Sequence, residues 1–201
     1  MKKYFLVLVF LLICKMSYAV DFTANYDYYQ QPNKGNNYDN GRGYALGLRH
    51  SILYPFDGHL EVIHMTDIDF PSISDVKGSF GELRGYGGIY SLILDLVYNK
   101  NVSFNINAGL GPVWWDFREN PYMQDSQIKV KVEPSLVMRA GVETNIKIYD
   151  NWFVDLGAGW MDTTIGKKVT TPRGDVLNLL DAGDQINLRY ITWKLAIRKK
   201  F

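Results

Sequence analysis

Residues 102–111 read VSFNINAGLG, and apolar and polar positions alternate along the whole stretch. Val102, Phe104 and Leu110 belong to the apolar series, and the positions between carry only Ser, Asn and Gly. Successive side chains of a β-strand point to opposite faces, so this stretch predicts a strand with one apolar and one polar face. The small polar side chains favour a narrow interior on the polar side.

The same period of two recurs along the chain. Three further stretches show it clearly: residues 21–30, 152–161 and 190–198. Four weaker stretches lie between them: about 44–54, 59–67, 83–97 and 130–146. Pro134 has no backbone N–H to donate to a ladder, so we expect the start of the last stretch to be irregular. Together these patterns predict eight strands.

The connections between the predicted strands alternate in length. Three are short and turn-like: residues 54–58, 98–101 and 147–151. Four are long and polar: residues 30–43, 68–82, 118–129 and 163–184. Short periplasmic turns and long outer loops are typical of small outer-membrane barrels. The predicted fold class is all-β, an eight-stranded antiparallel up-and-down transmembrane β-barrel after an N-terminal signal peptide.

The N-terminus has the features of a secretory signal. Lys2 and Lys3 precede an unbroken apolar run over residues 4–13, and Ser17 and Ala19 are the small residues that a signal peptidase reads. The alternative is a membrane-spanning anchor. Ten apolar residues span only about 15 Å as a helix, half of a hydrocarbon core of about 30 Å. The pattern therefore favours a cleaved signal peptide.

The predicted signal peptide covers residues 1–19 and is cleaved between Ala19 and Val20, which leaves one barrel domain over residues 20–201. A lipoprotein acylated at Cys14 is a second alternative. The residue before that cysteine is a bulky Ile, where a lipoprotein signal carries Gly, Ala or Ser. Export predicts a location in the outer membrane of a Gram-negative bacterium.

The composition excludes several classes of function. Lys+Arg 22 and Asp+Glu 21 leave a formal net charge of +1, so no basic field points to a nucleic-acid partner. The single Cys rules out a disulfide scaffold, and three scattered His disfavour a metal site. We therefore expect no nucleic-acid partner, no metal and no cofactor.

Alternation by itself does not decide whether the apolar face meets lipid or a protein core. Small and charged residues on the polar face favour a narrow polar lumen, with the apolar face turned to lipid. Charges of opposite sign would neutralise one another there, where an unpaired ion is costly. The sequence predicts a lumen charge network of eight residues: Asp27, Arg49, Asp95, Arg139, Glu143, Asp155, Lys194 and Arg198.

Aromatic residues near the strand ends support the same orientation. Trp and Tyr gather at the two membrane–water interfaces of outer-membrane barrels. The candidates for these girdles are Tyr26, Tyr28, Tyr44, Trp152, Trp160 and Trp193. The alternative is a soluble β domain or a lipocalin-like binder, in which the same residues would form a core.

The end of the chain resembles the terminal strand by which outer-membrane barrels are recognised for assembly. Phe201 is the last residue, and Ile197, Leu195 and Trp193 take the same face of the strand as Phe201. Lys199 departs from the pattern, because an aromatic or apolar residue is usual there. The resemblance implies the barrel-assembly machinery as a partner, beside outer-membrane lipid.

Two segments resemble the outer membrane protein W family. Asp150-Asn151-Trp152-Phe153-Val154 leads into Trp160-Met161-Asp162, within residues 142–162, like the late strands of that family. Ala108-Gly109-Leu110-Gly111 is similar to its mid-chain strand. The resemblance implies an eight-stranded barrel that passes small hydrophobic compounds, with release sideways into the bilayer. The charges predicted inside this chain conflict with a wholly hydrophobic lumen.

A lipid-modifying enzyme is the catalytic alternative, and His50-Ser51 is its candidate pair. Adjacent strand residues point to opposite faces, so these two side chains cannot easily share a hydrogen bond. His59 and His64 lie on opposite faces for the same reason, which weakens a metal site. We expect no catalytic site and place the three histidines at the barrel rim.

The function that the sequence favours is passive transport of small, apolar molecules by a monomeric barrel. The alternative is a structural or surface-interaction barrel, adhesin-like, whose long loops bind partners without transport. A path inside the barrel or through its wall would support transport, whereas a sealed lumen would support the surface role.

Overall fold

The computed structural model describes residues 20–32, 40–70, 81–99, 101–119, 129–170 and 185–201. The predicted signal peptide lies outside the described residues, so cleavage between Ala19 and Val20 stays a prediction. Within the described ranges, no helix is long and apolar enough to cross a membrane.

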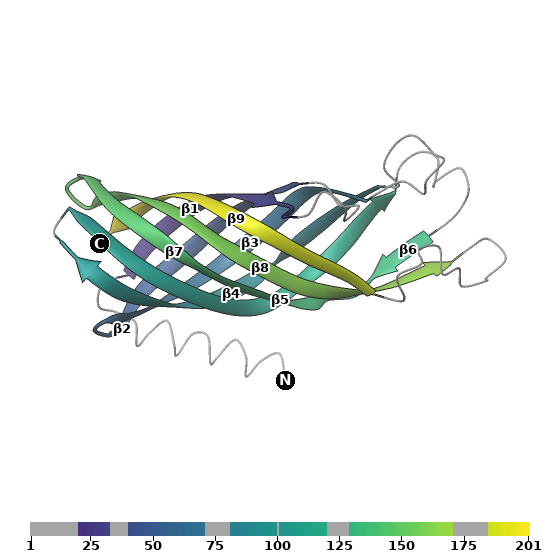
Figure 1. The fold of residues 1–201 in the computed structure, drawn as a ribbon, viewed down its shortest axis with the longest axis horizontal. Coiled ribbons are helices and arrows are strands. Elements are labelled where there is room, and N and C mark those ends of the chain that lie inside the picture. Colours follow the sequence, from purple (N-terminus) through teal and green to yellow (C-terminus); the bar gives the residue numbers. More distant parts are fainter. Residues whose placement is uncertain (1–19, 33–39, 71–80, 100, 120–128, 171–184) are drawn as a thin grey trace.

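Nine strands make up the described part of the chain (Figure 1). Their bounds are β1 Val20–Gln30, β2 Gly41–Leu53, β3 Phe56–Phe70, β4 Gly81–Tyr98, β5 Val102–Glu119, β6 Lys129–Val132, β7 Ser135–Tyr149, β8 Trp152–Thr170 and β9 Gln185–Lys200.

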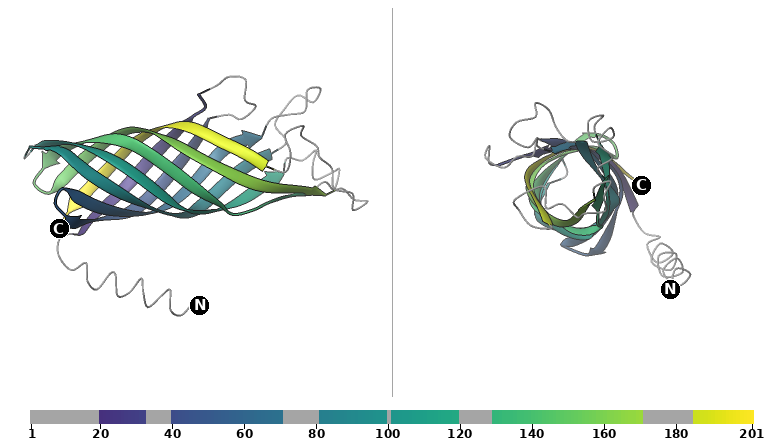
Figure 2. Two further views of the ribbon diagram at one scale, coloured as in Figure 1. Left: turned by 60° about the horizontal axis from the view of Figure 1, so that its bottom comes forward. Right: turned by 90° about the vertical axis from the view of Figure 1, so that its right-hand side faces the viewer.

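Eight of these strands close into a barrel. Each pairs antiparallel with the next in the order β1, β2, β3, β4, β5, β7, β8, β9, and β9 returns to β1, where Tyr26 opposes Leu195. The end-on view shows the closed ring (Figure 2). The predicted eight-stranded antiparallel barrel is confirmed.

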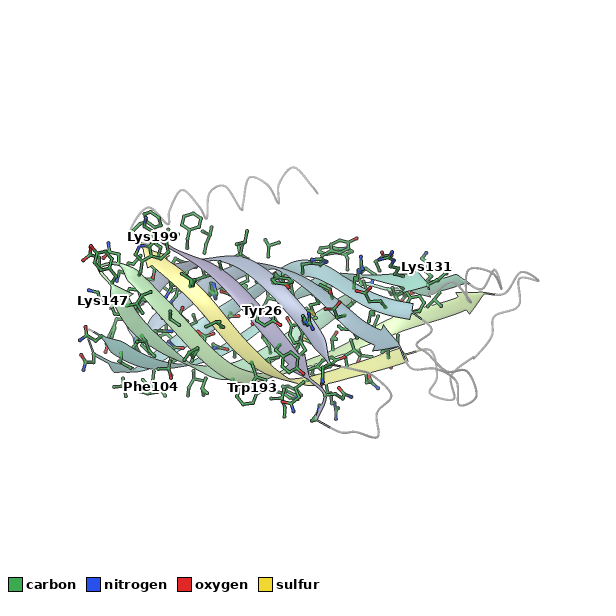
Figure 3. All side chains as sticks on the ribbon, turned by 90° about the horizontal axis from the view of Figure 1, so that it is seen from above. Tyr26, Phe104, Lys131, Lys147, Trp193 and Lys199 are labelled. Atoms are coloured by element: carbon green, nitrogen blue, oxygen red, sulfur yellow. The ribbon has the colours of Figure 1, made fainter. Side chains whose placement is uncertain are left out.

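Side chains alternate between the inside and the outside of the barrel. In β1, Asp21 and Asn25 are buried inside, while Phe22 and Tyr26 are exposed on the outer wall. Trp193 likewise stands on the outer wall (Figure 3). The polar face of these strands therefore points inward, as the small residues on it predicted.

The sixth strand of the barrel is interrupted. The sequence predicted one strand over residues 130–146, whereas the structure has β6 and β7 separated by Glu133 and Pro134. Proline cannot donate to the ladder, and the chain there is held by Glu133 N, which donates to Gly166 O at 2.8 Å. The break also changes which positions face the core: even-numbered residues such as Val130 do so in β6, and odd-numbered residues such as Val137 do so in β7.

Several strands run further than the sequence predicted. The loops expected over residues 68–82, 118–129 and 163–184 begin later, because β3 reaches Phe70, β5 reaches Glu119 and β8 reaches Thr170. In or beside these extensions, Ile68, Phe117 and Ile165 are buried on the inner face. This is the reverse of the pattern in the lipid-facing part of the barrel, so the extensions are harder to recognise as membrane strands.

Candidate functional site

The inner face changes from polar to apolar along the barrel axis. In β9, Arg198 and Lys194 lie near the short turns, and Tyr190, Leu188 and Ile186 follow toward the long loops. The side of the lumen that contains the charges is called the polar half. The other side, the apolar half, holds a buried cluster: Tyr29, Ala45, Ile63, Met65, Ile68, Leu83, Ile89, Val113, Trp115, Phe117, Val137, Met161, Ile165, Ile186, Leu188 and Tyr190.

Glu61 occupies the centre of the polar half and is 0% exposed. Arg139 Nη2 lies against its Oε2, and Lys194 Nζ lies 3.4 Å from its Oε1. Asn25 Nδ2 donates to the same Oε1, and His59 Nδ1 is 3.7 Å from Oε2. These partners come from β1, β3, β7 and β9, so one carboxylate ties together strands from different parts of the wall.

A second carboxylate shares the Lys194 ammonium. Lys194 Nζ donates to Glu143 Oε1 at 2.9 Å. Gly157 lies beside this pair, where a Cβ would come within 3.0 Å of Glu143 Cγ, so a bare backbone leaves room for the contact. With Asp27 and Arg139, these residues line a cavity of about 30 Å³, which has room for water.

Arg49 forms a second cluster nearer the short turns. Its Nε donates to Asp57 Oδ2 at 2.8 Å, and its Nη2 donates to Asp95 Oδ1 at 3.1 Å. Asn145 Oδ1 accepts from its Nη1 at 3.4 Å. The guanidinium therefore joins β2, β3, β4 and β7 across the lumen.

Arg198 forms a third cluster at the same end. Its Nη1 donates to Asp21 Oδ2 at 2.7 Å, and its Nε donates to Asp155 Oδ2 at 3.0 Å. The guanidinium also lies 4.4 Å from the ring centre of Phe153. The Arg49 and Arg198 clusters line a cavity of about 280 Å³ at the short-turn end.

All eight residues of the predicted lumen charge network lie on the inner face and line a cavity or join an ion pair there: Asp27, Arg49, Asp95, Arg139, Glu143, Asp155, Lys194 and Arg198. The prediction omitted Asp21, Asp57 and Glu61, so acids outnumber bases where four of each sign were expected. The sequence signal for Glu61 was its position between Leu60 and Val62, two apolar residues that take the outer face.

The rim position expected for the histidines is wrong for His59, which is 3% exposed inside the barrel. Its Nε2 lies 2.9 Å from Thr23 Oγ1, so the ring is held in the lumen by a hydrogen bond. His64 is exposed on the outer wall, and the two rings thus lie on opposite faces as predicted.

His50 and Ser51 have separate partners. His50 Nε2 lies 3.3 Å from the hydroxyl of Tyr90 on the outer wall, and Ser51 Oγ donates to Asp57 Oδ1 at 3.0 Å on the lumen side. The structure therefore does not bring these two side chains together as a catalytic pair.

The apolar half is filled by packed side chains. The rings of Tyr29 and Tyr190 lie 6.0 Å apart, and Ile63, Met65 and Leu188 around them are at most 2% exposed. The sequence predicted a polar inner face over the whole barrel, which is wrong here. Where the outward residues are charged, as at Arg84, Asp116 and Asp162, the inward residues are apolar, as in a barrel standing in water.

The barrel wall is interrupted beside the apolar half. The β5–β7 ladder ends where Val113 opposes Ser135, and β5 continues for six residues beyond it. Side-chain hydrogen bonds bridge the wall beyond the end of this ladder. Trp115 Nε1 donates to Ser135 Oγ at 2.7 Å, and Ser135 Oγ lies 2.7 Å from Thr163 Oγ1. Val130 N reaches Glu119 Oε1 further along, at 3.3 Å. Main-chain pairing is thus replaced by side-chain hydrogen bonds.

The outer wall carries an apolar band with a sharp limit. Large apolar side chains cover it from the short turns to an aromatic level formed by Tyr26, Tyr44, Tyr86, Trp114, Trp160 and Trp193. Two residues further along four of the strands, the outward positions are charged: Arg42, Arg84, Asp116 and Asp162. Apolar surface below this level suits lipid, and charged surface above it suits water.

The end of β9 keeps its apolar residues on the outer wall. Trp193, Leu195 and Ile197 are each about half exposed, and Phe201 packs edge-on against Phe22 with the ring centres 5.6 Å apart. Lys199 Nζ lies 4.9 Å from the Phe201 ring centre. Recognition of this end by the assembly machinery stays a prediction.

No protein-family model and no curated protein matches the chain. Among solved structures, it is similar to the outer membrane protein OprG from Pseudomonas aeruginosa, with a TM-score of 0.68, 9% identity, and 91% of this chain and 95% of that chain covered. Neisserial surface protein A has a TM-score of 0.56 and 15% identity, with 91% of this chain and 96% of that chain covered. The outer membrane protein W of E. coli has a TM-score of 0.52 and 13% identity, with 90% of this chain and 97% of that chain covered. The chain has an OmpW-like barrel fold. At these identities the likeness concerns the fold.

This OmpW-like barrel divides its lumen between two environments. The polar half holds the clusters around Glu61, Arg49 and Arg198, and the apolar half adjoins the wall interruption at Ser135. The resemblance found in the sequence implied a hydrophobic interior, and the apolar half has that character. The charges that conflicted with it lie in the other half.

Proposed function

We propose that this protein resides in the outer membrane of a Gram-negative bacterium and lets small apolar molecules pass from outside into the bilayer through its wall. The observation that carries the proposal is the position of the wall interruption. The β5–β7 ladder ends at Val113 and Ser135, directly beside the apolar half. A solute held among the apolar side chains would meet, at this place, a wall closed by side chains alone.

The polar half makes an axial route unfavourable. An apolar solute moving along the axis would have to separate Glu61 from Arg139 and Lys194, and unpaired buried charges cost several kcal/mol each. An exit through the wall avoids this cost. Trp114 lies on the outer side of the interruption at the aromatic level, so the exit would open near lipid.

Three features support the membrane location: the apolar band, its aromatic limit and the predicted signal peptide. The first measurement is an SDS gel of the outer-membrane fraction, unheated and boiled. We expect a band whose mobility shifts on boiling, because a folded barrel resists SDS. Recovery of the protein in the osmotic-shock fluid would contradict the location and point to a soluble binder.

Transport is tested with the purified protein in lipid vesicles. We expect a small apolar fluorophore to enter these vesicles several times faster than protein-free ones, while sugar-induced swelling stays at the protein-free rate. Equal entry of the fluorophore in both preparations would refute transport. Swelling in sugar would instead indicate an axial pore.

A surface-interaction barrel without transport is the second candidate. It is favoured by the outer wall beyond the aromatic level, where Arg42, Arg84 and Arg189 are part of a charged surface and β8 continues to Thr170. Such a wall would hold the loops away from the membrane. Cells lacking the protein would then take up the fluorophore normally and lose attachment to a surface or host cell.

A further inference from the structure

The pairing of β6 with the end of β8 forms a two-stranded extension of the barrel, residues 129–132 with residues 167–170, which we call the basic ribbon. Its eight residues contain four lysines and no acid: Lys129, Lys131, Lys167 and Lys168. Lys and Arg together make up 22 of the 201 residues of the chain, so half of eight residues is a marked concentration of positive charge.

The register brings two of these lysines together. Lys131 and Lys168 are direct partners across the β6–β8 ladder, and Lys129 lies two residues before Lys131 on β6. Lys167 is the partner of Val132, so its register position belongs to the opposite face of the ribbon. Like charges directly opposite each other destabilise an antiparallel pair. Repulsion between the two lysines therefore destabilises the ribbon, and a bound anion would reduce that repulsion.

The ribbon is held in a defined orientation. Val130 and Val132 are partly buried against the apolar core, and Val130 N donates to Glu119 Oε1 at 3.3 Å. Alternation along β6 then turns Lys131 away from the core, and its side chain is exposed (Figure 3). A cation held on a packed strand loses less freedom on binding than one on a loose loop.

The ribbon lies a short way beyond the aromatic level. In β5, Glu119 is the fifth residue after Trp114, which is about 16 Å along a strand. With a strand tilt of about 40°, the ribbon stands roughly 12 Å above the aromatic level. Arg118 is exposed on the same end of β5 and adds a further positive charge.

We propose that the basic ribbon binds phosphate groups of the lipopolysaccharide that surrounds the barrel. In an outer membrane, the phosphorylated saccharides of the outer leaflet lie at this height above the hydrocarbon boundary. Lysine ammonium groups bind phosphate as mobile point charges, and a paired set of them suits several phosphates on one saccharide. This rests on the outer-membrane location proposed above and not on transport.

The test compares two double variants of the full-length protein in detergent. K131E/K168E reverses the charge of the two paired lysines, and K147E/K200E makes the same change of net charge at the opposite end of the barrel, where both lysines are exposed. Binding is measured on surfaces coated with lipopolysaccharide, with dephosphorylated lipopolysaccharide or with heparin, over a range of NaCl. Gel mobility before and after boiling shows that each variant is folded.

We expect the ribbon variant to bind lipopolysaccharide at least tenfold more weakly than the wild type, and the control variant to stay within about twofold. Wild-type binding should weaken as salt rises and be lost on the dephosphorylated surface. Equal binding of lipopolysaccharide by both variants would overturn the proposal. Equal binding of the wild type to intact and dephosphorylated lipopolysaccharide would overturn it too. Binding to heparin but not to lipopolysaccharide would do so too, because the partner would then lie outside the cell.

A milder variant, K131Q/K168Q, serves if charge reversal prevents folding. Lysines on an edge strand also discourage pairing with another chain. If that were their role, the glutamine variant would associate with itself while keeping its affinity for lipopolysaccharide. We expect instead that the glutamine variant stays monomeric and binds lipopolysaccharide more weakly. Self-association with unchanged affinity would refute binding by the ribbon.

Discussion

The indole of Trp115 donates a hydrogen bond of 2.7 Å to the hydroxyl of Ser135, at the point where the β5–β7 ladder ends. Ser135 in turn contacts Thr163 Oγ1, which donates to Leu136 O at 3.0 Å. This chain of hydrogen bonds joins β5, β7 and β8 where main-chain pairing stops. It is therefore the place in the wall where few bonds separate the apolar half from the outside.

A disulfide across the last rung of the ladder would test whether this place opens. Val113 and Ser135 are register partners, and antiparallel partners lie about 4.5–5.5 Å apart at Cα, within reach of a disulfide. We expect oxidised V113C/S135C to lose entry of the apolar fluorophore and to regain it in dithiothreitol. Vesicle uptake under both conditions measures this.

The control for the disulfide is I106C/V142C, another register pair of the same ladder, on the outer wall of the polar half. Its oxidation is expected to leave uptake unchanged. If both disulfides abolish uptake, or neither does, the exit is not at the end of the ladder.

Glu61 should contribute more to folding stability than any exposed acid. In E61A the cations of Arg139 and Lys194 lose a buried partner, and we expect a loss of about 3–5 kcal/mol in the free energy of unfolding. Urea titration followed by tryptophan fluorescence gives the value. The control E82A removes the partly exposed Glu82–Arg84 pair, where solvent screens the charges, and should change little. Equal effects would contradict the central role of Glu61.

Removing charges from the polar half should not by itself create a channel. R139A/D155A opens two of its clusters, but the apolar half with Tyr29 and Tyr190 still fills the lumen toward the long loops. We expect no stepwise ion currents from this variant in planar bilayers. Discrete current steps would show that the charge network alone closes the barrel.

Trp114 and Trp115 are neighbours on opposite faces of β5, with exposed fractions of 46% and 7%. In variants that keep Trp114 or Trp115 as their single tryptophan out of the five in the chain, brominated lipid should quench Trp114 strongly and Trp115 weakly, because quenching needs contact with the acyl chains. Fluorescence in brominated and ordinary vesicles provides the comparison. Stronger quenching of Trp115 would invert the faces assigned to β5.

Phe201 is the residue through which we expect the assembly machinery to recognise the chain. F201A should lower the amount of heat-shifted protein in outer membranes several-fold while leaving refolding in detergent intact. The control F104A removes an outer-wall phenylalanine far from the chain end and should assemble more nearly as the wild type does. A normal yield of F201A would remove Phe201 from the assembly signal.

The period of two determined much of the fold. It is visible wherever one face meets lipid and the other a narrow lumen, as in residues 102–111, where Phe104 and Leu110 are exposed outside and Asn105 is buried inside. The same parity was sufficient to assign the charged residues of the lumen network to the inner face. A rule that acts between neighbours in sequence is enough for this, because strand geometry alone decides which face a side chain takes.

The tertiary structure decided what parity cannot. Parity tells that Glu61 and Arg139 both face inward, but only the register around a closed ring brings them into contact. The exchange of faces beyond the aromatic level depends on where lipid ends, and this height is a property of the whole barrel. The wall interruption at Ser135 likewise needs two strands and a break between them. Contacts between distant segments depend on how the strands close into a ring, and no single stretch of sequence determines that closure.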